Sequence, residues 1–135
     1  MPESSLHCPT CAVHVDEHEA SRCMDDWVAE KVMGWQLVYD EWMQGREPTY
    51  QPNEWHPSRF MDAAWDVVEK IAQRCILIID CVPSAKSFVV HLEDFEHKVR
   101  AEADTAPLAI CRAAIKAKAA SADEEQTIMP CPSNE

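Results

Sequence analysis

Four residues of the types that bind metal ions lie close together near the start of the chain: Cys8, Cys11, His18 and Cys23. Their pattern, C-x2-C-x6-H-x4-C, is close to the spacing of a zinc knuckle. Zn²⁺ prefers four tetrahedral ligands, and thiolate and imidazole are suited to it. Pro9 fixes a backbone angle between the first two cysteines, which favours a tight turn that aims both sulfurs at one ion. The sequence therefore predicts a zinc site formed by these four residues.

Two alternatives to this prediction arise from the same segment. His14 could replace His18 as the fourth ligand, and the cysteines could be free thiols or form disulfides in an oxidising compartment. The first six residues contain neither a basic start nor an apolar run, so we expect no secretory signal peptide. The odd cysteine count of 7 also favours a reduced metal site in the cytoplasm over a set of disulfides.

The predicted site is structural in character. A catalytic zinc ion keeps one position open for water, whereas three thiolates and one imidazole close all four positions. The polar segment 1–23 cannot bury enough apolar surface to order itself, so a bound ion would supply the missing folding free energy. We expect the metal to order this leader against a domain that spans residues 24–120 and folds without it.

The remaining cysteines have no ligand spacing. Cys75, Cys81 and Cys111 lie in apolar runs and are predicted to be small core residues. Cys131 lies in the acidic, proline-containing segment 121–135, which we predict to be a disordered tail with an exposed thiol.

The charge of the chain limits its partners. Its 135 residues include 24 Asp and Glu against 12 Lys and Arg, a formal net charge of −12 at pH 7. Nucleic-acid binding depends on basic residues that neutralise phosphates, so direct binding to nucleic acid is not expected. The simplest role of such a charge is solubility, and a more specific one is to attract a protein with a basic surface. No stretch is apolar enough to span a membrane.

Apolar residues recur with helical spacing in three segments. They predict helices over residues 24–33, which Gly34 would end, over 59–74, which Ser58 would cap, and after Thr105. The buried face predicted for the second helix consists of Phe60, Met61, Ala64, Trp65, Val67, Val68 and Ile71. The buried stripe predicted for the last helix consists of Leu108, Cys111 and Ile115.

Strands are predicted between these helices. Residues 35–39 alternate as a short strand, and the continuously apolar, β-branched run 75–81 indicates a buried central strand. Residues 87–92 would pair with it as a hairpin, and a further short strand is expected over 97–101. Residues 44–57 contain many turn formers and are predicted to be a loop. Together the elements predict an α+β domain, a helix–sheet–helix sandwich with a small, largely antiparallel sheet.

Three segments, residues 29–35, 64–70 and 103–117, resemble the bacteriophage ABA-sandwich domain family, a group of small phage and prophage accessory proteins. The resemblance extends over about residues 27–117. It implies a helix–sheet–helix sandwich and expression inside a bacterial host, and it implies no particular activity. Residues 16–23 are also similar to cysteine-bearing leaders of some members, which favours His18 over His14.

Three functions are compatible with these observations. The first is a non-enzymatic phage accessory protein that binds a host protein or signal, and counteracts antiviral defence as an inhibitor or nucleic-acid mimic. The second is a nucleic-acid-binding zinc protein, because a knuckle and 5 tryptophans could stack on bases. The third is a small enzyme of unknown chemistry, although His56, His91 and His97 belong to no recognisable catalytic motif. The exposed edge of a small sheet also allows a homodimer.

Overall fold

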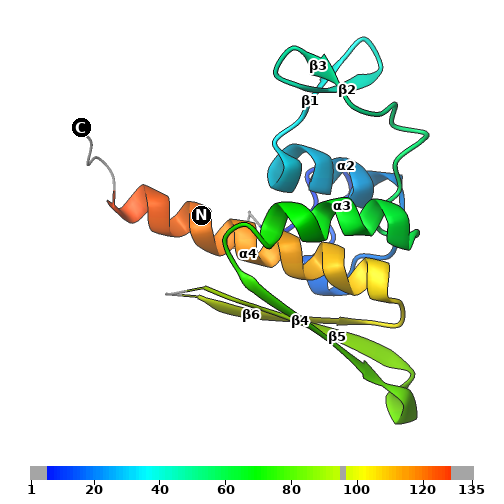
Figure 1. The fold of residues 1–135 in the computed structure, drawn as a ribbon, viewed down its shortest axis with the longest axis vertical. Helices are drawn as coiled ribbons and strands as arrows, with labels where there is room; N and C mark the ends of the chain where they lie inside the picture. The colour runs from blue at the N-terminus through cyan, green and yellow to red at the C-terminus, as the bar shows by residue number, and fades with distance from the viewer. Residues whose placement is uncertain (1–5, 95–96, 129–135) are drawn as a thin grey trace.

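The protein, in this computed structural model, is described over residues 6–94 and 97–128 (Figure 1). Three helices and two three-stranded antiparallel sheets confirm the predicted α+β class. The helices are α2 (Arg22–Val28), which continues into the π-helical turn η2 (Ala29–Met33), α3 (Met61–Ile71) and α4 (Ala106–Ile128). A short 3-10 turn, η1 (Val15–Glu17), precedes α2. A second one, η3 (Pro83–Ala85), joins two strands of the larger sheet. None of the described helices is long and apolar enough to cross a membrane.

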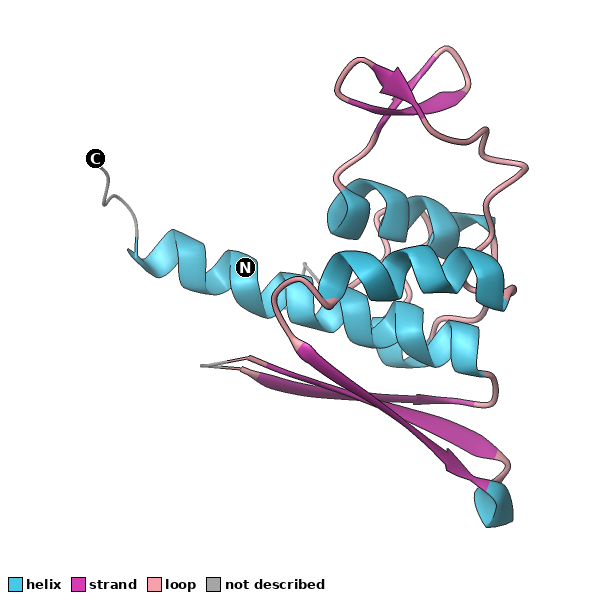
Figure 2. Cartoon of the chain, in the orientation of Figure 1, coloured by secondary structure: helices cyan, strands magenta, loops and turns pink. Residues whose placement is uncertain are grey.

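The larger sheet has the strand order β4 (Ile76–Val82), β5 (Ser87–Glu93) and β6 (Lys98–Ala103). The predicted hairpin of β4 with β5 and the predicted further strand are both present, in antiparallel pairing. The register places Ile79 beside Val90, and Val90 beside Ala101, on the face that the helices cover. All three helices lie on this one side of the sheet (Figure 2).

Helix α4 occupies the centre of the molecule, between the larger sheet and the layer of α2 and α3 (Figure 1). A helix with apolar residues on all sides is buried on all sides. Nearly every residue from Leu108 to Ile115 is buried, including the predicted stripe of Leu108, Cys111 and Ile115. The Thr105 hydroxyl accepts a hydrogen bond from the Leu108 N–H at 3.4 Å, as expected for a helix cap.

The smaller sheet corrects the prediction for the middle of the chain. The predicted strand over 35–39 exists as β1 (Gln36–Val38), but it pairs with β2 (Glu41–Gln44), which pairs with β3 (Glu47–Pro48). These strands form a separate sheet, and the first part of the predicted loop 44–57 belongs to it. Gly45 has a φ of 64°, a left-handed conformation that suits the turn between β2 and β3. Gly45 therefore marks a hairpin turn, and residues 49–57, which follow β3, form the predicted loop.

The start of α3 also differs from the prediction. Phe60 is the N-cap residue, and Ser58, predicted as the cap, is buried where its N–H donates to Asp25 at 2.9 Å. The predicted buried residues Phe60, Met61 and Trp65 are exposed, because the face of α3 toward α4 is filled by smaller residues. These smaller residues are Ala63, Ala64, Val67, Val68 and Ile71.

Two further predictions need correction at β4 and α4. The strand predicted as central is an edge strand, and β5 is central, so Cys81 is exposed and Cys75 is only partly buried. Gly34, with a φ of 76°, ends the first helix as predicted. The backbone of α4 continues to Ile128, beyond the predicted start of a disordered tail at residue 121. Residues 129–135, which include Cys131, lie outside the described residues.

Candidate metal centre

The structure brings the four predicted ligand residues together. The ligand atoms of Cys8, Cys11, His18 and Cys23 all lie within 4.8 Å of one another. The His18 Nε2 atom is 3.2 Å from the Cys11 sulfur and 3.3 Å from the Cys23 sulfur, and these two sulfurs are 3.8 Å apart. With Zn–S bonds of about 2.3 Å, two sulfurs of a tetrahedral site are separated by about 3.8 Å. The spacing of these atoms therefore fits a tetrahedral ion.

The first two ligands come from one tight loop. The Cys8 N–H donates to the Val13 carbonyl at 3.0 Å, and the Ala12 N–H donates to the Cys8 carbonyl at 2.8 Å. Ala12 has a φ of 67°, the left-handed conformation that closes this loop. The Thr10 N–H donates to the Cys8 sulfur at 3.4 Å, as backbone amides do for thiolate ligands. The loop therefore aims the Cys8 and Cys11 sulfurs at one point.

His18 follows η1, and its ring is held in one tautomer. Its Nδ1 atom lies 2.8 Å from the carbonyl oxygen of Glu19. A carbonyl oxygen only accepts hydrogen bonds, so Nδ1 carries the proton and the lone pair of Nε2 faces the sulfurs. This arrangement is the one in which a histidine coordinates a metal through Nε2.

Cys23 is supplied by the first turn of α2, where Ser21 is the N-cap and accepts a hydrogen bond from the Met24 N–H. Burial raises the pKa of the Cys23 thiol above its ordinary value. A backbone hydrogen bond at Val13 is the main cause that lowers the pKa of Cys11. The two thiols therefore differ in how readily they form the thiolate that a metal requires.

His14, the alternative ligand, is not in this group. Its Nδ1 atom accepts a hydrogen bond from the Asp16 N–H at 3.1 Å, and its ring packs edge-on against His7. The structure thus places His18, and not His14, beside the three sulfurs, and the assignment of His18 as the fourth ligand stays a prediction.

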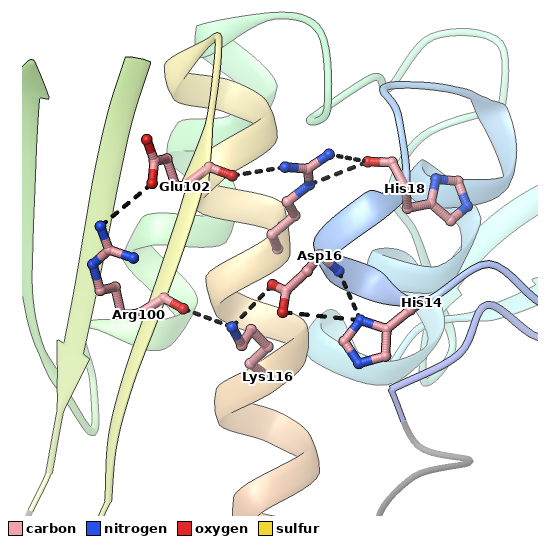
Figure 3. A network of polar contacts seen from close by, with 7 residues as sticks. His14, Asp16, His18, Arg100, Glu102 and Lys116 are labelled. Atoms are coloured by element: carbon pink, nitrogen blue, oxygen red, sulfur yellow. Dashed lines mark hydrogen bonds and ion pairs between the residues drawn. The ribbon is translucent and has the colours of Figure 1, made fainter. Parts of the chain in front are cut away.

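Two basic residues of α4 connect the candidate site to the rest of the fold (Figure 3). The Arg112 guanidinium donates two hydrogen bonds, at 2.7 and 3.1 Å, to the carbonyl oxygen of His18, and one to the Glu102 carbonyl at 2.6 Å. The Lys116 ammonium donates to Asp16 at 2.9 Å and to the Arg100 carbonyl at 2.7 Å. Each side chain thus joins the leader to β6. This role is not among the sequence predictions, although two basic residues four positions apart in an otherwise apolar helix are a usable signal.

A second buried polar cluster lies beside α2. The Asp25 carboxylate accepts a hydrogen bond from the Ser58 N–H and lies 3.2 Å from His56 Nδ1, while His56 Nε2 lies 2.9 Å from the Asn53 carbonyl. Burial raises the pKa of Asp25, and its hydrogen bonds with Ser58 and His56 act in the opposite direction. Both ring nitrogens of His56 are engaged, so this cluster joins the loop after β3 to α2.

The other histidines named above lie elsewhere. His91 on β5 pairs with Asp80 at 3.2 Å, and His97 lies 3.5 Å from Asp94. These two and His56 therefore contact three different carboxylates and do not form one catalytic group.

The fold and the cysteine cluster define a small α+β sandwich protein whose leader carries four residues that could hold a metal ion. The chain belongs to the phage ABA sandwich domain family, whose model matches residues 26–115. A crystal structure of a phage protein from Bacillus cereus ATCC 14579 is similar, with a TM-score of 0.60 and 25% sequence identity. The similarity covers 74% of this chain and 93% of that one. No curated protein matches the chain. The candidate metal ligands all precede the matched range.

Proposed function

We propose that the chain is a non-enzymatic phage accessory protein that binds a basic segment of a host protein. The observation that carries this proposal is the exposed apolar surface of α3, which consists of Phe60, Met61 and Trp65. Trp65 is 50% exposed and Phe60 is 55% exposed. Large aromatic side chains such as tryptophan contribute much of the binding energy when a partner buries them.

The charges around this surface indicate the chemistry of the partner. On a helix, residues three and four positions apart are neighbours. Trp65 therefore has the exposed carboxylates of Asp62 and Glu69 on its two sides and the Met61 side chain beside it. An aromatic ring attracts a Lys or Arg side chain over its face, and flanking carboxylates strengthen that attraction. The surface suits a partner with basic side chains next to apolar ones.

The rest of α3 holds this surface in a fixed position. Asp66 accepts hydrogen bonds from the Trp55 indole at 3.0 Å and from the Tyr50 hydroxyl at 3.3 Å. These two rings stack on each other, and both contact Trp35, so the loop after β3 is tied to α3. A surface on a helix supported in this way needs little reordering on binding, which favours affinity.

Nucleic-acid binding has less support. Trp27, Trp35, Trp42 and Trp55 are buried in the core and present no face for a base to stack on. Trp65 is flanked by carboxylates, which repel phosphates. A gel-shift series with single-stranded DNA and RNA at low salt tests this alternative, and a shift at micromolar protein would favour it over the proposal.

The proposal is tested by affinity purification from bacterial cells that express the tagged chain. We expect a host protein to be enriched by the unchanged chain and to be lost, by at least about tenfold, with Trp65→Ala, as is typical of a central interface tryptophan. Tyr39→Ala is the matched control, because Tyr39 is an exposed aromatic residue in the turn between β1 and β2, outside α3.

A role against host antiviral defence is tested separately, by phage survival on defended hosts that express either variant. Protection that is lost with Trp65→Ala and kept with Tyr39→Ala would support it. The proposal fails when the unchanged chain enriches no host protein, or when Trp65→Ala enriches the same protein equally well.

A further inference from the structure

The two edges of the larger sheet differ. At the β6 edge, the outward carbonyl groups of Arg100 and Glu102 accept hydrogen bonds from Lys116 and Arg112 (Figure 3). The side chains of α4 therefore close this edge. Among the described strands, β4 pairs only with β5, so its other side is an open edge.

The contacts at β6 also determine which backbone groups of β4 point outward. Paired residues of antiparallel strands alternate between hydrogen-bonded and non-hydrogen-bonded pairs. Because the carbonyls of Arg100 and Glu102 point away from β5, the β5 residues opposite them direct their N–H and C=O groups toward β4. These β5 residues are His91 and Val89, and they pair with Ile78 and Asp80 of β4. The alternate residues of β4 therefore direct their N–H and C=O groups out of the sheet. These residues are Leu77, Ile79 and Cys81.

Strand β4 itself carries few of the features that keep sheet edges from pairing. Edge strands are normally protected by charges, prolines, bulges or covering elements. The seven residues of β4 contain no proline, and Asp80 is their one charged residue. Ile76 is 66% exposed and Ile78 is 50% exposed on the face away from the helices. On the other face, Leu77 and Ile79 are only partly buried, since α4 packs mainly over β5 and β6.

We propose that β4 pairs with β4 of a second copy of this chain, in antiparallel orientation about a twofold axis at Ile79. In this register Ile79 faces Ile79 of the second copy, and Leu77 faces its Cys81, so the outward backbone groups of all three residues find partners. Ile76 faces Val82 of the second copy on the other face. Asp80 faces Ile78 of the second copy, which keeps the two Asp80 carboxylates from lying opposite each other.

A second copy suits this edge because a twofold contact uses the same surface on both chains. One strand supplies matching donors, acceptors and apolar residues to itself, and two three-stranded sheets become one six-stranded sheet. This inference does not depend on the proposed function, because the α3 surface lies on the helical side of the molecule and needs no dimer.

The test is sedimentation equilibrium of the full chain over a range of concentrations, with two substitutions at one exposed position. Ile78→Glu places a carboxylate opposite Asp80 of the second copy, and this happens twice in each dimer. Like charges directly opposite each other destabilise a strand pair, so we expect the dissociation constant to rise about tenfold or more. Ile78→Lys places an ammonium opposite the same Asp80, so the dimer should remain within about threefold of its original affinity.

Tyr39→Glu is the control for net charge, since it adds one negative charge far from β4 and should leave the dimer unchanged. Circular dichroism of each variant verifies that the fold is kept. A monomeric unchanged chain at about 100 µM, where a specific dimer should form, would overturn the inference. So would equal weakening by Glu and Lys at position 78, or dimer loss with Tyr39→Glu.

Discussion

At the scale of single residues, the contacts of His18 are the most informative for the candidate metal site. Its Nδ1 atom donates to the Glu19 carbonyl, its carbonyl oxygen accepts from Arg112, and its Nε2 atom faces two sulfurs. The ring orientation is therefore set by the protein chain itself. A ligand held in place before the ion arrives loses less conformational entropy on binding.

The first prediction compares the two histidines that the sequence left open. We expect His18→Ala to weaken zinc binding by more than about a hundredfold, since even residues that support a ligand contribute roughly 10–100-fold. His14→Ala should bind zinc like the unchanged chain, because His14 contacts Asp16 and His7 and not the sulfurs. Metal content and the thiolate absorption of the cobalt-substituted chain measure both variants. Equal loss in the two variants would contradict the ligand assignment.

At the scale of elements, the helices and the β4–β5 hairpin were predictable because their apolar spacing is strong. The position of β4 was not predictable, because a continuous apolar run is compatible both with a central strand and with an edge that another chain covers. The smaller sheet was missed because its strands are short and Gly45 and Pro48 resemble loop residues. Helical spacing predicts Trp65 in the core, because periodicity cannot separate a wide buried face from a narrower one that lies next to exposed apolar side chains.

The candidate site could also be predicted only in part. The proximity of Cys8, Cys11, His18 and Cys23 was predictable from residue types and spacing alone, because their pattern is close to that of a zinc knuckle and such a site needs all four side chains close together. The connection through Arg112 could not be predicted, since it joins residues 94 positions apart in the chain. Only the packing of α4 against both β6 and the leader brings them together.

A second prediction concerns this connection between elements. Arg112→Met keeps the apolar part of the side chain and removes three hydrogen bonds to two carbonyl groups. We expect the free energy of unfolding to fall by about 2–3 kcal/mol, because the carbonyls of His18 and Glu102 lose a charged donor. Lys118→Met, at an exposed position of the same helix, should change it by less than about 0.5 kcal/mol. Urea denaturation measures both, and equal small changes would contradict a connecting role.

At the scale of the whole molecule, the leader is more closely integrated than the sequence indicated. Cys8 and Val15 belong to the same buried cluster as residues of α2, α3 and α4. The family match begins at residue 26, so the leader lies outside the matched range and still takes part in the core. An ion that orders the leader should therefore stabilise the whole domain, and not the leader alone.

The last prediction separates these two possibilities. A ligand that binds only the folded state stabilises it by an amount that grows with its concentration, about 4 kcal/mol at a thousand times its dissociation constant. We therefore expect zinc, added under reducing conditions, to raise the melting temperature of the domain by roughly 5 °C or more relative to the chelated chain. The increase should be smaller in Arg112→Met, because loss of this contact uncouples the leader from α4, and unchanged in Lys118→Met. A melting temperature that is the same with zinc and with chelator, together with measured zinc binding, would show that the leader folds on its own.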